Sequence, residues 1–110
     1  MAEGGIGRMW RGWTSGDQAD GYEAVFRDVV LPELRDVAGC RGAYLLRRDD
    51  AEGAEFVTLT LFDSLDAVRA FAGEQYETAV ISDEARAVLR DFDTTARHFT
   101  IIVAPDGAGQ

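Results

Sequence analysis

The chain has 110 residues, 46% of them hydrophobic, and a formal net charge of -9 at pH 7 from 20 acidic and 11 basic side chains. This length suits one domain with its own core, and a chain this acidic repels phosphate backbones and anionic lipids, so we expect neither nucleic-acid nor membrane binding. No apolar run approaches the roughly 18 residues of a membrane span, and no basic region followed by an apolar stretch opens the chain, so we expect a cytoplasmic protein.

Missing residue types narrow the possible chemistry. The sequence contains no lysine, so Schiff-base lysine chemistry and a phosphate-loop lysine are excluded. One cysteine, Cys40, and one histidine, His98, cannot build a zinc site from the usual nitrogen and sulfur ligands, and we interpret Cys40 as a packing residue. The acidic segment 49–53 lacks the ligand spacing of a calcium loop and is typical of a solvated turn. We therefore expect no metal site.

Hydrophobic periodicity predicts four elements in the first half of the chain. Alternation predicts a strand at 6–14, with Arg8 and Trp10 on the same face. Ser15 and Gln18 form a capping-box pattern that opens a helix, which Pro32 interrupts and Gly39 ends. Two further strands, at 41–48 and 55–62, are predicted to pair antiparallel through a hairpin loop of about five residues.

The second half predicts a broken helix and a last strand. Asp63 or Ser64 caps a helix that runs to about Ala72, Gly73 interrupts it, and 74–80 is predicted to continue it. Ser82 caps a third helical piece, whose buried side comprises Ala85, Val88, Leu89 and Phe92. Alternation predicts the final strand at 96–103.

This order of elements predicts an α+β fold of the ferredoxin-like β-α-β-β-α-β class, with a four-stranded antiparallel sheet and helices on one face. We expect a single domain over 1–110, with a core at about 6–103 and flexible ends at 1–5 and 105–110. A monomer of this fold leaves one sheet face bare, so we expect a homodimer. We assign its wall to the face of the third strand that carries Phe56, Thr58, Thr60 and Phe62.

His98 and Tyr76 are the candidate catalytic residues. His98 is the side chain whose ordinary pKa lies near neutrality, so it is the natural general base, although a structural hydrogen bond to a carboxylate or to the dimer partner is the alternative. Tyr76, just after the break at Gly73, could donate its hydroxyl to a substrate oxygen, or could belong to the core. With Phe71, Tyr76 is expected at the mouth of a pocket.

Trp10 and Arg8 form the candidate substrate-binding pair. An indole supplies a stacking surface and a guanidinium supplies a fixed positive charge, which together suit a planar anionic aromatic ligand. Simple stacking of the two side chains on each other or on the surface is the alternative. Tyr44 is a further binding candidate, but it lies on the opposite face of its strand from Arg47, so at most one of these two can join a given pocket.

Several short segments carry a resemblance to a known family. They comprise 8–12 on the first strand, 39–44 entering the second, 55–57 and 62–65 around the third, 71–74 at the helix break, and Arg97-His98-Phe99 on the last strand. Over roughly 6–103 the chain resembles the antibiotic biosynthesis monooxygenase superfamily. That resemblance implies a dimeric α+β barrel. It also implies cofactor-independent oxygenation of polycyclic phenols in some branches, haem degradation in others, and no assigned activity in many members.

The sequence departs from one pattern within this family. The branches that act on haem or anthrone-like substrates resemble one another in surrounding the ligand with an asparagine, a tryptophan and a histidine. This chain contains no asparagine, and its tryptophans lie on the first strand, while the second helical region carries Phe71 and Tyr76. The resemblance therefore disfavours haem degradation here.

The function expected from these observations is a cofactor-independent, monooxygenase-like activity on an aromatic or quinone-type small molecule. In this hypothesis His98 is the base, Tyr76 is a hydrogen-bond donor, and Arg8 with Trp10 holds the ring. The alternative is a non-catalytic homodimer of the same fold that binds a small molecule or acts as an accessory protein.

Overall fold

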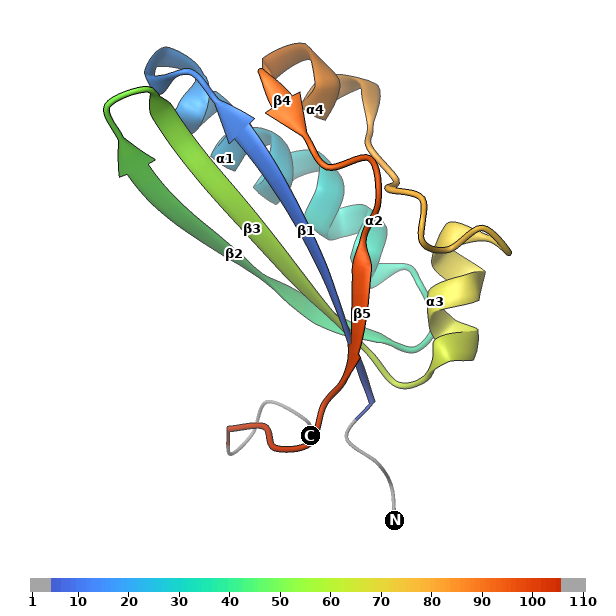
Figure 1. Cartoon of the computed structure of the whole chain (residues 1–110). Helices are drawn as coiled ribbons and strands as arrows, with labels where there is room; N and C mark the ends of the chain where they lie inside the picture. Colours follow the sequence, from blue (N-terminus) through green and yellow to red (C-terminus); the bar gives the residue numbers. More distant parts are fainter. Residues whose placement is uncertain (1–4, 106–110) are drawn as a thin grey trace.

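A computed structural model describes residues 5–105 of the chain. One antiparallel sheet is built from β1 (Ile6–Thr14), β2 (Cys40–Asp50), β3 (Gly53–Phe62), β4 (Asp91–Phe92) and β5 (Arg97–Thr100). The strand order is β2-β3-β1-β4, and β5 also pairs with β1 (Figure 1). Because β4 pairs with one end of β1 and β5 with the other, these two short strands together take the place of a fourth strand. The predicted ferredoxin-like α+β fold is confirmed.

The first helical region changes its geometry before its proline. A 3-10 turn (Gly16–Gln18) leads into α1 (Ala19–Val25), a π-helical turn (Phe26–Val30) follows, and α2 (Leu31–Arg35) carries Pro32 in its first turn. Pro32 has no N–H to donate, and a wider turn just before it accommodates that loss. The predicted capping box is wrong, because the side chain of Ser15 makes no capping hydrogen bond.

The β2–β3 hairpin is tighter than predicted. The strands pair as far as Asp50 and Gly53, so the loop contains two residues, Ala51 and Glu52, and not five. The side chain of Asp50 accepts hydrogen bonds from the N–H groups of Glu52 at 2.8 Å and Gly53 at 3.1 Å. Because this carboxylate accepts hydrogen bonds from two N–H groups of the turn, a two-residue loop is stable and the strands pair along their full length.

Two serine caps define the later helices. Ser64 Oγ accepts from the N–H of Ala67 at 3.2 Å at the start of α3 (Leu65–Ala72), and Ser82 Oγ accepts from the N–H of Ala85 at 3.1 Å at the start of α4 (Asp83–Val88). Both helix starts are confirmed. Helix α4 ends before Leu89, and Phe92 belongs to β4, so the third helical piece is shorter than predicted.

The segment between α3 and α4, residues 73–82, is called the strap below. The prediction that 74–80 continues the helix is wrong, because Gly73 has a φ of 86° and the chain beyond it runs along the segment that precedes β5. The N–H of Ala79 donates to the carbonyl of Thr94 at 3.0 Å, and the N–H of Ala96 donates to Glu77 at 2.7 Å. These long-range hydrogen bonds replace the helical ones that local periodicity predicted.

The helices cover one face of the sheet, and among residues 5–105 no helix lies on the other (Figure 1). On β3 the covered face carries Phe56 and Phe62, both fully buried, with Thr58 and Thr60 also buried between them. The assignment of these four residues to a dimer wall is therefore wrong. The bare face is the opposite one, and its exposed apolar side chains include Tyr44, Leu46 and Phe99.

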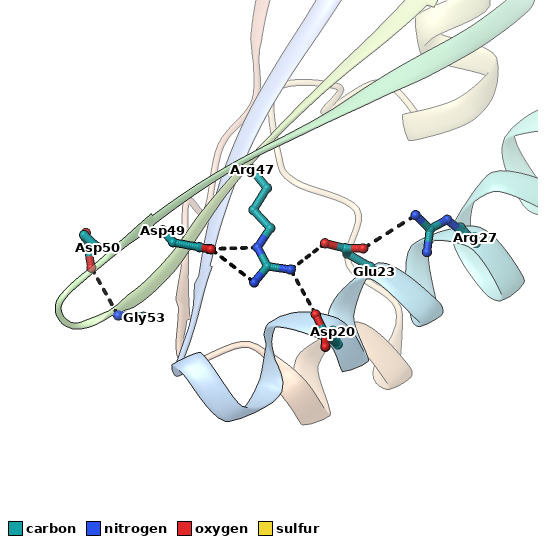
Figure 2. A network of polar contacts seen from close by, with 7 residues as sticks. All are labelled: Asp20, Glu23, Arg27, Arg47, Asp49, Asp50 and Gly53. Carbon is teal, nitrogen blue, oxygen red and sulfur yellow. Dashed lines mark hydrogen bonds and ion pairs between the residues drawn. The ribbon is translucent and has the colours of Figure 1, made fainter.

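Arg47 fastens the end of β2 to helix α1 (Figure 2). Its guanidinium pairs with Asp20 at 3.0 Å, Glu23 at 2.6 Å and Asp49 at 2.8 Å. Its Cζ atom also lies 5.9 Å from the centre of the Phe56 ring. Although each pair is partly exposed and individually weak, several acids on one arginine hold α1 in a defined position on the sheet.

No helix in the described part of the chain is long and apolar enough to cross a membrane. The flexible ends predicted at 1–5 and 105–110 lie outside the described residues except for Gly5 and Pro105. Gly5 is buried, and its carbonyl accepts a hydrogen bond from the N–H of Ile101 at 2.9 Å, so the residue just before β1 is bonded to the residue just after β5.

Candidate active site

Arg8 is a buried charge at the centre of the candidate site. It lies on β1 with only 5% of its surface exposed. Its guanidinium donates hydrogen bonds to the backbone carbonyls of Tyr76 and Thr78, the latter at 3.1 Å, and lies 5.5 Å from the centre of the Phe71 ring. Burial lowers the pKa of Arg8, and no acidic side chain among residues 5–105 forms an ion pair with it. A buried cation in this setting favours an incoming anion.

His98 is the neighbour of Arg8 on the adjacent strand. The two residues pair across β1 and β5, and His98 Nε2 lies 3.1 Å from a terminal guanidinium nitrogen of Arg8. Because an arginine only donates, Nε2 accepts and the ring proton is assigned to Nδ1. Burial lowers the pKa of His98, the positive charge of Arg8 lowers it further, and Glu77 partly opposes both. The imidazole is therefore neutral at pH 7 and able to accept a proton.

A cavity lies between the sheet and the helices, beside Arg8. It encloses about 60 Å³, room for a few water molecules and less than the 300 Å³ or more of typical ligand pockets. Its polar lining residues are Arg8, Tyr22, Thr58, Thr60 and Ser82, and Trp10, Phe26, Phe71 and Ile81 are among its apolar ones. The cavity thus combines one cation, several hydroxyls and aromatic walls.

The strap closes one side of this cavity. Val80, Ile81 and Ser82 line it, while the carbonyls of Tyr76 and Thr78 accept the hydrogen bonds of Arg8. The same guanidinium therefore faces the cavity and holds the strap over it. A ligand of aromatic size requires displacement of the strap, and Gly73 at its start has the conformational freedom for such a movement.

An open groove lies on the far side of Arg8 and contains His98. The groove has a volume of about 680 Å³, and Tyr76, Glu77, Arg97 and Thr100 also line it. The ring of Tyr76 packs edge-on against that of His98, with centroids 5.2 Å apart and an interplanar angle of 82°. Arg8 lines the cavity and His98 lines the groove, so their contact joins the two.

The sequence predicted six site residues, and the structure does not bring all six together in one site. Arg8, Trp10 and Phe71 line the cavity, and His98 and Tyr76 line the groove next to it. Tyr44 does not join them. On β2 it pairs with Leu59, whose side chain lies on the bare face, so Tyr44 is separated from the cavity by the sheet itself.

Sequence reasoning missed the hydroxyl groups of the cavity. Tyr22 of α1 is buried in the core and also lines the cavity, and it was not among the residues proposed for the site. Thr58 and Thr60 were placed on the correct common face of β3, and the error lay in assigning that face to a dimer contact. The sequence signal for these hydroxyl groups was the presence of two threonines between Phe56 and Phe62 on one face of β3. All four residues are buried, and a buried hydroxyl needs a polar partner or a ligand.

No cluster of three or more histidine, cysteine or acidic side chains that could hold a metal ion occurs among the residues that the structure describes. The polar groups of the cavity are arginine and hydroxyl groups, which donate hydrogen bonds well to oxygen. The arrangement can bind an oxygen anion at Arg8, stack a ring on aromatic side chains, and place a neutral imidazole next to the anion-binding group.

The model of the antibiotic biosynthesis monooxygenase family matches residues 8–83, which include β1, the first helical region, the β2–β3 hairpin, α3 and the strap. The chain belongs to the antibiotic biosynthesis monooxygenase family. Membership of this family supports a monooxygenase-like function in general terms. No curated protein matches the chain closely enough to count as a relative.

Solved structures share the fold of this family member at low sequence identity. A provisionally named antibiotic biosynthesis monooxygenase from Chloroflexus aurantiacus superposes with a TM-score of 0.60 at 11% identity, covering 90% of this chain and 94% of that one. One from Caulobacter crescentus, also provisionally named, gives 0.60 at 19% identity with 93% of each chain covered. Rv0793 from Mycobacterium tuberculosis gives 0.58 at 19% identity, covering 92% of this chain and 98% of that one.

Proposed function

We propose that the protein is a cofactor-independent monooxygenase that acts on an aromatic phenol or quinone-type small molecule. The observation that carries this proposal is Arg8, a buried arginine that lines the cavity between sheet and helices and has no acidic partner among residues 5–105. An ionised phenol supplies the missing negative charge, and Trp10 and Phe71 supply apolar walls for its ring.

The proposed reaction converts a ring CH₂ group next to the phenol into a carbonyl. Removal of one proton gives a carbanion whose charge is delocalised onto the ring carbonyl that the substrate already carries. This carbanion donates its electrons to dioxygen, and the peroxide anion takes up the removed proton to form a carbon-bound hydroperoxide. Loss of water from the hydroperoxide then leaves the carbonyl. One dioxygen is consumed, one oxygen atom stays in the product and the other leaves as water, so no external reductant is required.

In this scheme His98 accepts the substrate proton. Its Nε2 atom accepts a hydrogen bond from Arg8 before substrate arrives. When the substrate oxygen binds the guanidinium, it competes for that donor and frees Nε2 to take the proton. Tyr76 acts as a positioning residue, because its ring packs edge-on against His98 and its carbonyl accepts from Arg8.

Turnover of an anthrone tests this proposal. The wild-type protein is expected to produce the quinone with consumption of one dioxygen per product, measured by absorbance and an oxygen electrode. We expect His98→Gln to lower kcat about 100-fold, in the range of lost general-base catalysis. Trp10→Phe is expected to raise KM more than it lowers kcat, because the indole binds the ring and takes no part in proton transfer.

Thr14→Val is the matched control, because Thr14 is a buried hydroxyl residue on the same strand that does not line the cavity. Its activity is expected to equal that of the wild type. Unchanged turnover in both His98→Gln and Trp10→Phe would refute the assignment.

The second candidate function is a non-catalytic homodimer that binds a small molecule. The small volume of the cavity and the engagement of His98 Nε2 by Arg8 favour it. Binding of the anthrone with no oxygen consumption above the rate of the buffer alone would identify this function.

We also propose that the chain forms a homodimer through the bare face of the sheet. The apolar side chains on this face or beside it include Tyr44, Leu46, Leu59, Leu61, Phe99 and Ile102. Several of them are exposed, Ile102 by 83% and Leu46 by 52%, and a contiguous apolar surface of this kind is typical of a protein interface. A second copy offers the same surface, as a two-fold interface requires.

Leu59→Asp is expected to convert the dimer to a monomer, because it places a charge at the middle of the apolar face. Light scattering should give twice the 12.0 kDa chain mass for the wild type and one chain mass for the variant. The control is Ala24→Asp on the exposed side of α1, which is expected to remain dimeric. A wild-type protein that is monomeric at micromolar concentration would contradict the proposal.

A further inference from the structure

Tyr22 is a buried phenol at the end of the cavity away from Arg8. It lies on α1, only 2% of its surface is exposed, and its ring centre is 4.7 Å from that of Phe56. Thr58 on β3 lies beside it, and both residues line the cavity. Burial raises the pKa of Tyr22, and the nearby Thr58 hydroxyl partly opposes this shift. The phenol therefore keeps its proton at neutral pH and can donate a hydrogen bond.

The two polar ends of the cavity are separated by about two residues of strand. Arg8 pairs with Thr60, and Trp10 pairs with Thr58, all on the face that the helices cover. Residues two apart on a strand lie about 7 Å apart, which is comparable to the span of one aromatic ring with an oxygen at each end. Trp10 lies at the Thr58 end, and its indole Nε1 donates to the carbonyl of Asp93 at 2.7 Å, which fixes the ring plane.

The position of Tyr22 is held from outside the cavity. Asp20 and Glu23, its near neighbours on α1, both pair with Arg47 of β2 (Figure 2). The same guanidinium lies over Phe56, the ring against which Tyr22 packs. Tyr22 is therefore attached to the sheet through a ring contact and through the ion pairs of its helix, as expected of a group that must keep a fixed direction.

We propose that Tyr22 and Thr58 form a second, uncharged oxygen-binding site in the cavity, which receives the carbonyl of a phenolate ligand whose anionic oxygen binds Arg8. This inference rests on the proposed function of the cavity as a ligand site, and it names the ligand class as an aromatic ring that carries an ionised hydroxyl and a conjugated carbonyl. During oxygenation, negative charge that develops on the carbonyl is stabilised by the Tyr22 hydroxyl, which donates to it.

Two single-ring probes separate the two binding sites. The first, 4-hydroxybenzaldehyde at a mildly alkaline pH, carries a phenolate and a carbonyl, whereas benzaldehyde carries the carbonyl alone. No lysine is available to form an imine with either probe. Calorimetric titration is expected to show that Tyr22→Phe weakens both probes by roughly tenfold, the effect of one lost hydrogen bond. Arg8→Gln is expected to weaken only 4-hydroxybenzaldehyde.

Thr14→Val again serves as the control, because it removes a buried hydroxyl outside the cavity, and it is expected to bind both probes like the wild type. Unchanged binding of both probes by Tyr22→Phe would overturn the inference, as would a wild-type protein that binds neither probe. Because binding is measured without turnover, an inactive protein that shows the expected pattern would refute the proposed monooxygenase function and leave this inference standing.

Discussion

Arg8→Gln is expected to weaken the binding of ionised aromatic ligands by about 10- to 100-fold, the effect of losing a hydrogen bond between charged groups. Arg8 is buried, and the described chain provides no acid to neutralise it, so the proposed anionic ligand would act as its counter-ion. Glutamine retains an N–H donor on a shorter side chain and carries no charge. Titration with 4-hydroxybenzaldehyde at a pH where its phenol is ionised measures the change.

The same substitution is expected to raise the pKa of His98. In the wild type, burial and then the charge of Arg8 hold that pKa below its ordinary value of 6.5. Removal of the charge leaves the burial in place, so the pKa should rise part of the way back. His98 is the single histidine of the chain, so its ring resonances can be followed by NMR across a pH titration without an assignment problem.

Folding stability should respond to pH in the corresponding direction. Below about pH 6.5 the unfolded chain binds a proton at His98, whereas the folded chain does not until the pH falls to its lower native pKa. The folded state therefore loses stability as the pH falls through this interval. Urea denaturation at a series of pH values should show a smaller loss for Arg8→Gln, because the gap between the two pKa values is narrower.

Arg90→Gln is the matched control, since Arg90 is an exposed arginine and its backbone, not its side chain, bonds to Trp13. This variant should leave ligand affinity and the His98 titration unchanged. A His98 pKa that stays the same in Arg8→Gln would show that the guanidinium does not act on the imidazole.

Gly53→Ala is expected to destabilise the fold by roughly 3–4 kcal/mol, a large part of the stability of a small domain. Gly53 has a φ of 145°, and a Cβ atom built on it would lie 2.1 Å from the carbonyl oxygen of Thr14. Alanine must therefore shift the start of β3 against the end of β1, where the hairpin joins the central strand. The midpoint of urea denaturation measures the loss.

Gly16→Ala provides the comparison, because no atom lies within 4 Å of the position that its Cβ would occupy. Its stability should differ from that of the wild type by no more than about 0.5 kcal/mol. Equal denaturation midpoints for the two variants would contradict the tight approach of Gly53 to Thr14.

Local sequence signals predicted the elements well where the deciding groups are close in the chain. The caps at Ser64 and Ser82 depend on residues within one helical turn. Ser82 was identified as a cap, and Ser64 was one of the two residues proposed for the other cap. The end of α3 before Gly73 was also identified, although the helix was wrongly expected to resume after it. The strap was predicted wrongly, because its backbone bonds to Arg8 and to 94–96 from distant parts of the sequence. The spacing of apolar residues over 74–80 reflects local structure only and cannot reveal hydrogen bonds to such distant residues.

The candidate site shows the same division. Alternation along β1 placed Arg8 and Trp10 together, and both line the cavity. Alternation along β3 grouped Thr58 and Thr60 with Phe56 and Phe62, but a period of two does not state which face the helices cover. Tyr44 was misplaced for the same reason, since its face could be named only after the sheet and helices were packed.

The sequence alone determined the order of elements, the ferredoxin-like class, and the pairing of Arg8 with Trp10 on one face. These follow from the spacing of neighbouring side chains, which backbone geometry converts directly into faces and turns. Tertiary structure alone decided that Arg8 is buried without an acid in the described chain, that it contacts His98 and the strap, and that Tyr22 lines the same cavity as Arg8. These contacts join residues from separate elements, whose relative positions depend on how the whole core packs.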